Sequence, residues 1–335
     1  MGILPLIDQK GVAGRESRHT PEMDMTPSVD RARPRRNPGT RRRYSGTRRN
    51  TLAAAAFLAP TLGLIVLLRI VPTGGAVRDS MRQGLPGSLA EPDFVGLEVF
   101  TELFQSARFW QSVQQTLIFN VIVNPLQIIL ALALAVLLTR GLPGTGLWRT
   151  LIFLPAAVPL AGSTIVWGIA LRPDGPVNGV LALFGVPRQP WFTSPDQVIL
   201  ALIILASWIG IGYWMMFLIA GLNDVPQVYF EAARMDGAGP VRTFFSVTLP
   251  MLRRPILFVL VADTVANFVL FAPVQILTSG GPERQSNFLM YDIFHRSFEL
   301  SDPYTASAQL VILLLLMIAI VVVQFRLLGS TEGEE

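Results

Sequence analysis

The chain has 335 residues, of which 51% are hydrophobic and only 15% charged, and its mean hydropathy is +0.48. Soluble domains average about 25% charged residues, so this composition indicates a membrane protein. The formal net charge is +4, cysteine is absent and histidine occurs twice, which excludes disulfides and thiolate metal sites and argues against a histidine-based zinc site.

Residues 1–50 form a basic segment that we expect to be a disordered tail. Nine arginines lie between Arg31 and Arg49, among prolines and glycines and with little apolar surface to bury. Such an arm could bind nucleic acid, but it directly precedes an apolar segment. This position favours contact of the arginines with anionic membrane lipids, and we expect no nucleic-acid partner. Met23 and Met25 leave open where translation starts.

Six apolar segments of about twenty residues follow, each able at about 1.5 Å per residue to cross a hydrocarbon core of about 30 Å. Residues 51–328 are therefore expected to form an all-α membrane domain of six transmembrane helices, with a short acidic tail at 329–335. Prolines within the domain are expected to kink or interrupt helices; they are Pro125, Pro155 and Pro159. The six segments are Leu52–Val71, Leu117–Leu138, Leu151–Leu171, Val198–Ala220, Ile256–Leu277 and Ala306–Leu327.

The arginines also predict the orientation of the chain. If the N-terminus is inside, sixteen of the arginines from residue 31 onward lie on the inner side and seven in the outer loops, with Arg69 at the outer end of the first segment. Positive residues favour the cytoplasmic side. Both termini are therefore expected in the cytoplasm, together with the polar loop at 223–255.

This polar loop separates the fourth and fifth apolar segments. Asp224 can cap a helix, with Gln227 three residues later in the position of a capping box. The helix is expected over 225–236, where Gly237 can adopt the left-handed conformation that ends many helices.

At 100° per residue this helix has two faces, and Gly239-Pro240 predicts a second short helix after it. The apolar face is expected to pack on the bundle; it holds Val225, Val228, Tyr229, Ala232 and Met235. The other face lacks an evident partner in this chain, which suggests either a headgroup-level surface or a contact for another protein. It holds Gln227, Glu231 and Arg234, with Phe230 beside them.

The loop resembles the EAA loop of ATP-binding cassette (ABC) importer permeases. Glu-Ala-Ala at 231–233, Gly237 and Val247-x-Leu249-Pro250 have its spacing, although the family prefers isoleucine where Val247 stands. Further stretches are similar to the sugar-type permeases of the MalF and UgpA kind, and the likeness covers about residues 52–328. They are Phe94–Asn120, Arg149–Pro159 and Leu277–Pro282, whose "LTSGGP" favours the first of the two permease subunits.

The resemblance implies a type I ABC importer permease fold in which the EAA helix couples the permease to a cytoplasmic ATPase subunit. Phe230 and Arg234 would suit a contact hot spot there, or ordinary packing within the chain. The implied coupling residues are Phe230, Glu231, Ala232, Ala233, Arg234, Asp236 and Gly237.

The same resemblance implies a bacterial inner-membrane complex that imports a carbohydrate-class solute: a sugar, an oligosaccharide, glycerol phosphate or a glycerophosphodiester. Its other members would be a second, MalG- or UgpE-like permease, two ATPase subunits and an extracytoplasmic solute-binding protein. ATP and Mg²⁺ would bind the ATPase subunits, and this chain would hold no cofactor.

No catalytic residue is expected in this chain. A phosphate-binding P-loop needs Gly-x4-Gly-Lys-[Ser/Thr], whereas the sole lysine, Lys10, follows "LPLIDQ". No serine nucleophile or metalloprotease motif is evident either. The chain is therefore expected not to be an enzyme.

Polar side chains within the apolar segments are candidates for a substrate path, because they are costly in lipid. Asp263 and Asn267 share a helix face, and the alternative for them is bonding between helices. Bonding between helices is favoured for Asn120 and Asn124, and packing is favoured for the tryptophan side chains. The path candidates are Asp263, Asn267, Trp208, Asn124 and Gln275, with Gln127, Tyr213 and Trp214 also considered.

An ion-driven secondary transporter of a small polar solute is the alternative function. It predicts inverted repeats and several carboxylates within spans. The sequence has one deep carboxylate, Asp263, and no evident repeat, and this alternative leaves the EAA loop unexplained.

Overall fold

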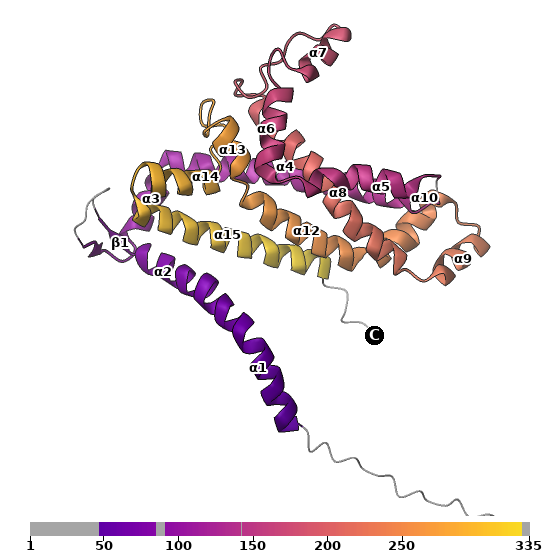
Figure 1. Cartoon of the computed structure of the whole chain (residues 1–335), viewed down its shortest axis with the longest axis horizontal. Helices are drawn as coiled ribbons and strands as arrows, with labels where there is room; N and C mark the ends of the chain where they lie inside the picture. The colour runs from indigo at the N-terminus through magenta and orange to yellow at the C-terminus, as the bar shows by residue number, and fades with distance from the viewer. Residues whose placement is uncertain (1–46, 85–90, 142, 330–335) are drawn as a thin grey trace, which may run out of the picture. The chain divides into compact units, whose positions relative to one another are not determined.

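The computed structural model describes residues 47–84, 91–141 and 143–329, which are helical apart from one short antiparallel hairpin and the connecting segments (Figure 1). In the hairpin, Arg82 pairs with Phe94 and Gln83 with Asp93. In chain order the elements are α1 (Thr47–Ile65), η1 (Val66–Ile70), α2 (Val71–Asp79), β1 (Arg82–Gln83), β2 (Asp93–Phe94), α3 (Glu98–Gln105), α4 (Ala107–Leu138), α5 (Thr145–Phe153), η2 (Leu154–Ala157), α6 (Leu160–Ala170), α7 (Pro176–Leu183), α8 (Val198–Asn223), α9 (Gln227–Met235), α10 (Pro240–Thr243), η3 (Phe244–Thr248), α11 (Leu249–Met251), α12 (Arg253–Phe268), α13 (Ala272–Leu277), α14 (Leu289–Phe294), η4 (His295–Glu299) and α15 (Pro303–Gly329).

The chain divides into two compact units after Leu58, within α1. The expected basic tail lies outside the described residues up to position 46. Because α1 begins at Thr47, the last residues of the segment 1–50 are helical where disorder was expected. The alanine run directly after them favours helix strongly, which explains this early start. The expected acidic tail also lies outside the described residues from position 330 onward.

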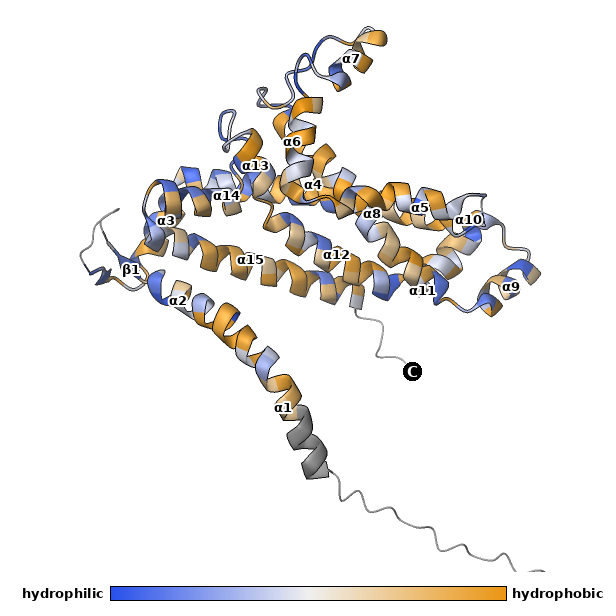
Figure 2. Cartoon of the chain, viewed as in Figure 1, coloured by the Kyte–Doolittle hydropathy of each residue, from blue (hydrophilic) through white to orange (hydrophobic). Residues whose placement is uncertain are grey.

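Within the described residues, five helical segments are long and apolar enough to cross a membrane, and the bent pair α5–α6 adds a sixth if it counts as one span. Figure 2 shows apolar residues along α4, α8 and α15, and more polar colouring on α9. The five segments are Ala55–Asp79, Ala107–Leu138, Val198–Asn223, Arg253–Leu277 and Pro303–Gly329.

The third apolar segment is broken at its prolines, as the sequence predicts. The helical stretches Thr145–Ala157 and Leu160–Ala170 meet at 99°. Between them, Val158 is extended, with φ −87° and ψ 133°. The residue before a proline is restricted to this region, so Pro159 explains the break. By contrast, α4 continues through Pro125 without interruption.

The fifth apolar segment is also discontinuous, which the sequence analysis did not anticipate. Helix α12 ends at Phe268 and α13 begins at Ala272. The candidate path residues Asp263 and Asn267 therefore lie in the last turns of α12 and Gln275 lies beyond the break. A non-helical stretch inside a membrane is tolerated only where protein or a water-filled cavity surrounds it.

Helix α4 begins at Ala107, ten residues before the expected start at Leu117. Six of the ten residues in this extension are polar, so a hydropathy criterion leaves it out. Ser106 caps the helix by accepting a bond from the backbone N–H of Phe109 at 3.4 Å. The polar side chains then find partners between α13 and α14; Gln115, for example, donates to Gln285 at 2.7 Å.

Three apolar clusters form the core of the described residues, and α4 contributes to each of them. Phe109, Phe119 and Ala131 of α4 are fully buried, one in each cluster. The first cluster adds α3, α14, α15 and the end of α12, the second adds the start of α8, α13 and α14, and the third adds the end of α8 and α12. Helix α4 is thus the central element of the bundle.

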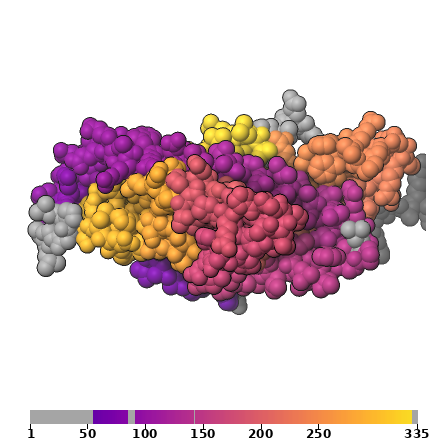
Figure 3. Space-filling view, turned by 90° about the horizontal axis from the view of Figure 1, so that it is seen from above, coloured from indigo at the N-terminus to yellow at the C-terminus, as the bar shows by residue number. Residues whose placement is uncertain are grey.

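The ends of this bundle differ in what they carry. Figure 1 shows α9 and α10 at one end, and α3, α14 and the hairpin at the other. The space-filling view agrees, with the α9 region (orange) and the α14 region (yellow) at opposite ends and the segment around α7 (red) in front (Figure 3).

A buried carboxylate organises the segment between α13 and α15. Asp292 accepts bonds from Arg284 at 3.2 Å, Asn287 at 3.1 Å, Arg296 at 3.3 Å and Gln309 at 2.7 Å. Burial on its own would raise the pKa of Asp292, but the bonds from Asn287 and Gln309 and the charge of Arg296 together lower it below its ordinary value of 3.8. The carboxylate therefore ties this segment to α15.

Helices α5 and α8 approach so closely at Gly212 that a Cβ there would collide with the carbonyl oxygen of Ile152. We expect Gly212→Ala to lower the unfolding free energy by about 1–3 kcal/mol, the usual cost of overpacking. Thermal unfolding of the purified protein measures this. Gly146→Ala on α5 is the matched control, because nothing lies within 4 Å of a Cβ there. Equal melting temperatures for both variants would show that the helices are not in close contact.

The second prediction concerns acid stability. Because the folded pKa of Asp292 is lowered, its ionised form stabilises the fold above the unfolded pKa of about 3.9, and this stabilisation is lost as pH falls through the folded pKa. Asp292→Asn should therefore cost about 1–3 kcal/mol at neutral pH, with a difference from wild type that shrinks below about pH 4. Thermal unfolding against pH tests this, with the exposed Asp174→Asn as control. A pH-independent difference would contradict it.

Candidate functional site

The polar loop folds as two short helices, α9 and α10, but its first helix begins differently from the expectation. Asp224 does not cap α9: it is the C-cap of α8, and its backbone N–H donates to Ala220 at 3.2 Å. Pro226 is extended instead, so α9 starts at Gln227 without a side-chain cap. The expected start at Val225 is therefore two residues early.

The end of α9 agrees with the sequence prediction. Gly237 has a φ of +70°, and its N–H donates to the carbonyl of Arg234 at 3.0 Å. The N–H of Ala238 donates to the carbonyl of Ala233 at 2.9 Å. This is the Schellman pattern, which requires a residue that tolerates the left-handed region. The second helix follows at Pro240, as predicted.

The apolar face of α9 does not pack on the bundle as its amphipathicity predicts. Val228 is 61% exposed, Tyr229 46% and Met235 85%, so most of the apolar face does not pack on the described bundle. Phe230 is half-buried and faces a cavity, together with Arg234. The ends of α4 and α8 border a cavity opposite α9 and do not pack against it, so its polar face is not buried either: Gln227 and Arg234 are exposed. Of the remaining motif residues, Glu231 and Ala232 are exposed.

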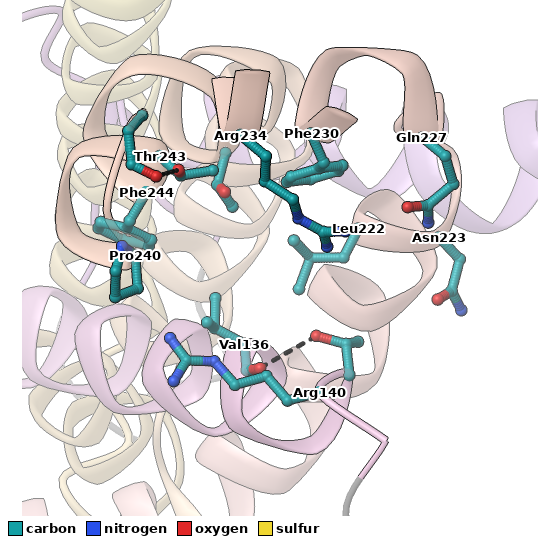
Figure 4. A pocket seen from close by; sticks show the side chains of 13 residues that line it. Val136, Arg140, Leu222, Asn223, Gln227, Phe230, Arg234, Pro240, Thr243 and Phe244 are labelled. Carbon is teal, nitrogen blue, oxygen red and sulfur yellow. Dashed lines mark hydrogen bonds between the residues drawn. The ribbon is translucent and has the colours of Figure 1, made fainter. Parts of the chain in front are cut away.

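The cavity has a volume of about 620 Å³ and lies between α9, α10, η3 and the ends of α4 and α8. Figure 4 shows Phe230 and Arg234 above it, Arg140 and Val136 below it, and Leu222 between them. Its other lining residues are Thr139, Asn223, Gln227, Ala238, Pro240, Thr243, Phe244 and Thr248.

The second candidate region is a buried polar cluster between α4, α8, α12 and α15. Asp263 accepts bonds from Trp214 at 2.6 Å and Asn267 at 3.0 Å. Asn267 also donates to Asn124 at 2.8 Å, and Asn124 donates to Thr264 at 3.1 Å. The structure thus brings three of the five path candidates together: Asp263, Asn267 and Asn124.

The other two path candidates lie apart from this cluster. Trp208 contacts Trp167 edge to face at 5.8 Å. Gln275 lies on α13, where its side-chain oxygen accepts no bond from the described residues. Gln127 likewise has no bonded amide atom among the described residues and packs against Gly210. Asn120 donates to the carbonyl of Thr116 at 2.8 Å, within α4 itself, and not to a neighbouring helix as expected.

Sequence reasoning missed two members of the cluster and one pairing. Gln324 of α15 donates to Thr264 at 2.8 Å. Gln324 is a polar residue in a strongly apolar segment, and that signal was sufficient to identify it. Thr264 gave little signal, because threonine bonds readily to its own helix, as it does here to Leu260 at 2.7 Å. Trp214 was noted, but not as the donor to Asp263.

The cluster is suited to binding rather than to covalent chemistry. One oxygen of Asp263 is buried and accepts no bond from the described residues. In the described part of the chain, no group of three or more potential metal ligands occurs.

Comparison with known proteins places these features in a family. A family profile described as "Binding-protein-dependent transport system inner membrane component" matches residues 127–330. The sn-glycerol-3-phosphate transport system permease protein UgpA of Pectobacterium atrosepticum is 35% identical over 271 residues, or 80% of this chain and 90% of that protein. The probable ABC transporter permease protein YesP of Bacillus subtilis is 31% identical over 286 residues, which cover 83% of this chain and 91% of that protein.

Solved structures show the same fold at lower identity. A chain of a bacterial ABC transporter involved in the import of the acidic polysaccharide alginate superposes with a TM-score of 0.72 at 18% identity, covering 85% of this chain and 98% of that one. A chain from the bacterial alginate ABC transporter in complex with an alginate pentasaccharide-bound periplasmic protein superposes with a TM-score of 0.71 at 18% identity. The match covers 83% of this chain and 94% of that one.

The buried cluster predicts a specific effect of the Trp214 indole. Trp214→Phe keeps an aromatic ring but removes one of the two donors to a buried oxygen of Asp263, which then accepts from Asn267 alone. We expect the free energy of unfolding to fall by about 1–2 kcal/mol, measured as a lower melting temperature in detergent. Tyr213→Phe is the control, since that neighbouring ring is 41% exposed. If Trp214→Phe is as stable as the control, the indole bond contributes nothing to the fold.

Proposed function

The chain belongs to the family of binding-protein-dependent transport system inner membrane components, and from this membership we propose that it is the permease subunit of an ATP-driven ABC importer for a carbohydrate-class solute. It is a multi-pass protein of the bacterial inner membrane and a transport component rather than an enzyme. The observation that carries the proposal is the combination of this membership with a polar loop whose first helix, α9, is followed by a left-handed turn at Gly237.

The proposed topology has six spans with both termini in the cytoplasm. It counts the bent pair α5–α6 as one span and α12–α13 as another. The arginine distribution supports this orientation, because positive residues favour the cytoplasmic side. The basic tail would then contact anionic lipid on the inner leaflet.

Helix α9 is the proposed coupling element. Its exposed surface combines Glu231 with Val228, Tyr229 and Met235, an aromatic and apolar patch of the kind enriched at protein interfaces. We place the contact with the ATPase subunit on this patch, while Phe230 and Arg234 face the chain's own cavity. Ala232 and Ala233 permit close approach, and Gly237 permits the sharp bend after Asp236.

The proposed assembly contains a second, homologous permease, two ATPase subunits that bind ATP and Mg²⁺, and an extracytoplasmic solute-binding protein. Family membership supports these partners. Closure of the ATPase dimer would move α9, and the bundle would open outward to accept solute from the binding protein. This chain would bind no cofactor of its own.

The polar cluster is the proposed substrate path. The free oxygen of Asp263 and the amide of Asn267 offer an acceptor and donors to a polyol. The broken fifth segment follows directly after them, and discontinuous helices frequently surround transporter sites. Trp208 and Gln275 lie apart from the cluster, so their assignment to the path rests on their position in the spans alone.

A test of coupling measures ATPase activity of the assembled complex in nanodiscs. We expect Glu231→Ala and Gly237→Pro to reduce the stimulation by a loaded binding protein to about a tenth or less, because the first removes an interface charge and the second disrupts the left-handed turn. Glu102→Ala, an exposed glutamate on α3, is the control and should be stimulated normally.

Loading candidate binding proteins with sugars and glycerophosphodiesters in turn identifies the solute class. If the wild-type chain recruits no ATPase subunit, the coupling role of α9 is wrong, and an ion-driven transporter becomes the leading account.

A further inference from the structure

The cavity beneath α9 is unusually rich in positive charge and hydrogen-bond donors. Arg140 lies just after the end of α4 and Arg234 on α9, and the side chains of both line the same cavity (Figure 4). Neither arginine forms an ion pair within the described residues, and none of the lining residues is acidic. Two arginines facing one cavity without a counter-charge favour an anion.

Neutral donors add to this charge. The side-chain amides of Asn223 and Gln227 line the cavity, and neither is bonded to another described residue. Thr139 and Thr243 already donate their hydroxyl protons to backbone carbonyls, at 3.0 Å in each case, so they contribute less. The available donors are thus two guanidinium groups and two amides, a set that suits a tetrahedral oxyanion.

The walls of the cavity strengthen such an interaction. Val136, Leu222, Phe230 and Phe244 supply apolar surface next to the charged groups. Electrostatic attraction is larger beside apolar walls than in bulk water. Arginine also fits phosphate better than lysine does, because its planar fork can bind two oxygens at once.

We propose that this cavity binds a phosphate group between Arg140 and Arg234. The bound anion would link α9 to the end of α4 and so hold the coupling helix in place against the bundle. This proposal rests on the cytoplasmic placement of α9 in the proposed topology, where inner-leaflet lipid headgroups and free phosphate are both at hand. Basic pockets between helices on that side commonly bind anionic headgroups.

The test follows backbone hydrogen exchange of α9 by mass spectrometry in the full-length chain, without ATPase subunits. One arm titrates inorganic phosphate into nanodiscs of phosphatidylcholine, and the other compares these discs with discs that also contain phosphatidylglycerol. We expect one of the two additions to slow exchange over 227–235 by about threefold to tenfold. Slowing by phosphatidylglycerol alone identifies a lipid source, and slowing by phosphate identifies a free anion.

Substitutions show whether the effect arises in the cavity. Arg140→Gln and Arg234→Gln should each weaken the slowing, and the double variant should abolish it. Arg242→Gln, on the same loop but outside the lining residues, is the matched control and should retain it. If a glutamine variant is unstable, Arg140→Lys with Arg234→Lys keeps the charge and should bind more weakly than wild type.

Three outcomes would overturn the proposal: no slowing with either addition, equal loss in Arg242→Gln, or slowing only when an ATPase subunit is added. The last result would assign the two arginines to the protein interface. Hydrogen exchange is measured without ATP or partner subunits, so it tests anion binding even if the ATPase coupling test fails. In the same way, the coupling test stands even if no anion binds.

Discussion

The bundle depends on a ladder of polar side chains along one face of α4. Ser112, Thr116, Asn120 and Asn124 recur every fourth residue and are all buried. In a membrane such groups must be satisfied within the protein, because lipid offers no hydrogen bonds. Three of the four therefore fix a neighbour: Ser112 accepts from Asn287 at 3.4 Å, Thr116 accepts from the backbone of Leu289 at 2.8 Å, and Asn124 bonds to both Thr264 and Asn267.

The ladder unites parts of the chain with different tasks. Its first half holds the segment between α13 and α15, which Asp292 ties in turn to α15. Its second half holds the end of α12, directly before the break in the fifth apolar segment. Helix α9, by contrast, meets the bundle mainly across an open cavity. The fold therefore combines a firmly bonded interior with a loosely attached loop helix, an arrangement suited to an element that must move.

The sequence was sufficient where local chemistry decides the outcome. Apolar length predicted the spans, Pro155 and Pro159 predicted the bend, and Gly237 predicted the end of α9. It was insufficient where the partner lies far along the chain. The Trp214–Asp263 bond joins residues 49 apart, and no periodicity reports it. The apolar face of α9 was expected to pack on the bundle but is mostly exposed, because amphipathicity shows that a helix has two faces, but not how much of either face the bundle covers.

The exposed apolar face of α9 also affects how cells can produce this protein. A surface that presents Val228 and Met235 to water at 61% and 85% exposure is a point of self-association until a partner covers it. A surplus of this subunit would therefore be the fraction that aggregates or is degraded. The same side chains that serve an interface would then keep the subunits of a complex in balanced number, without any dedicated regulator.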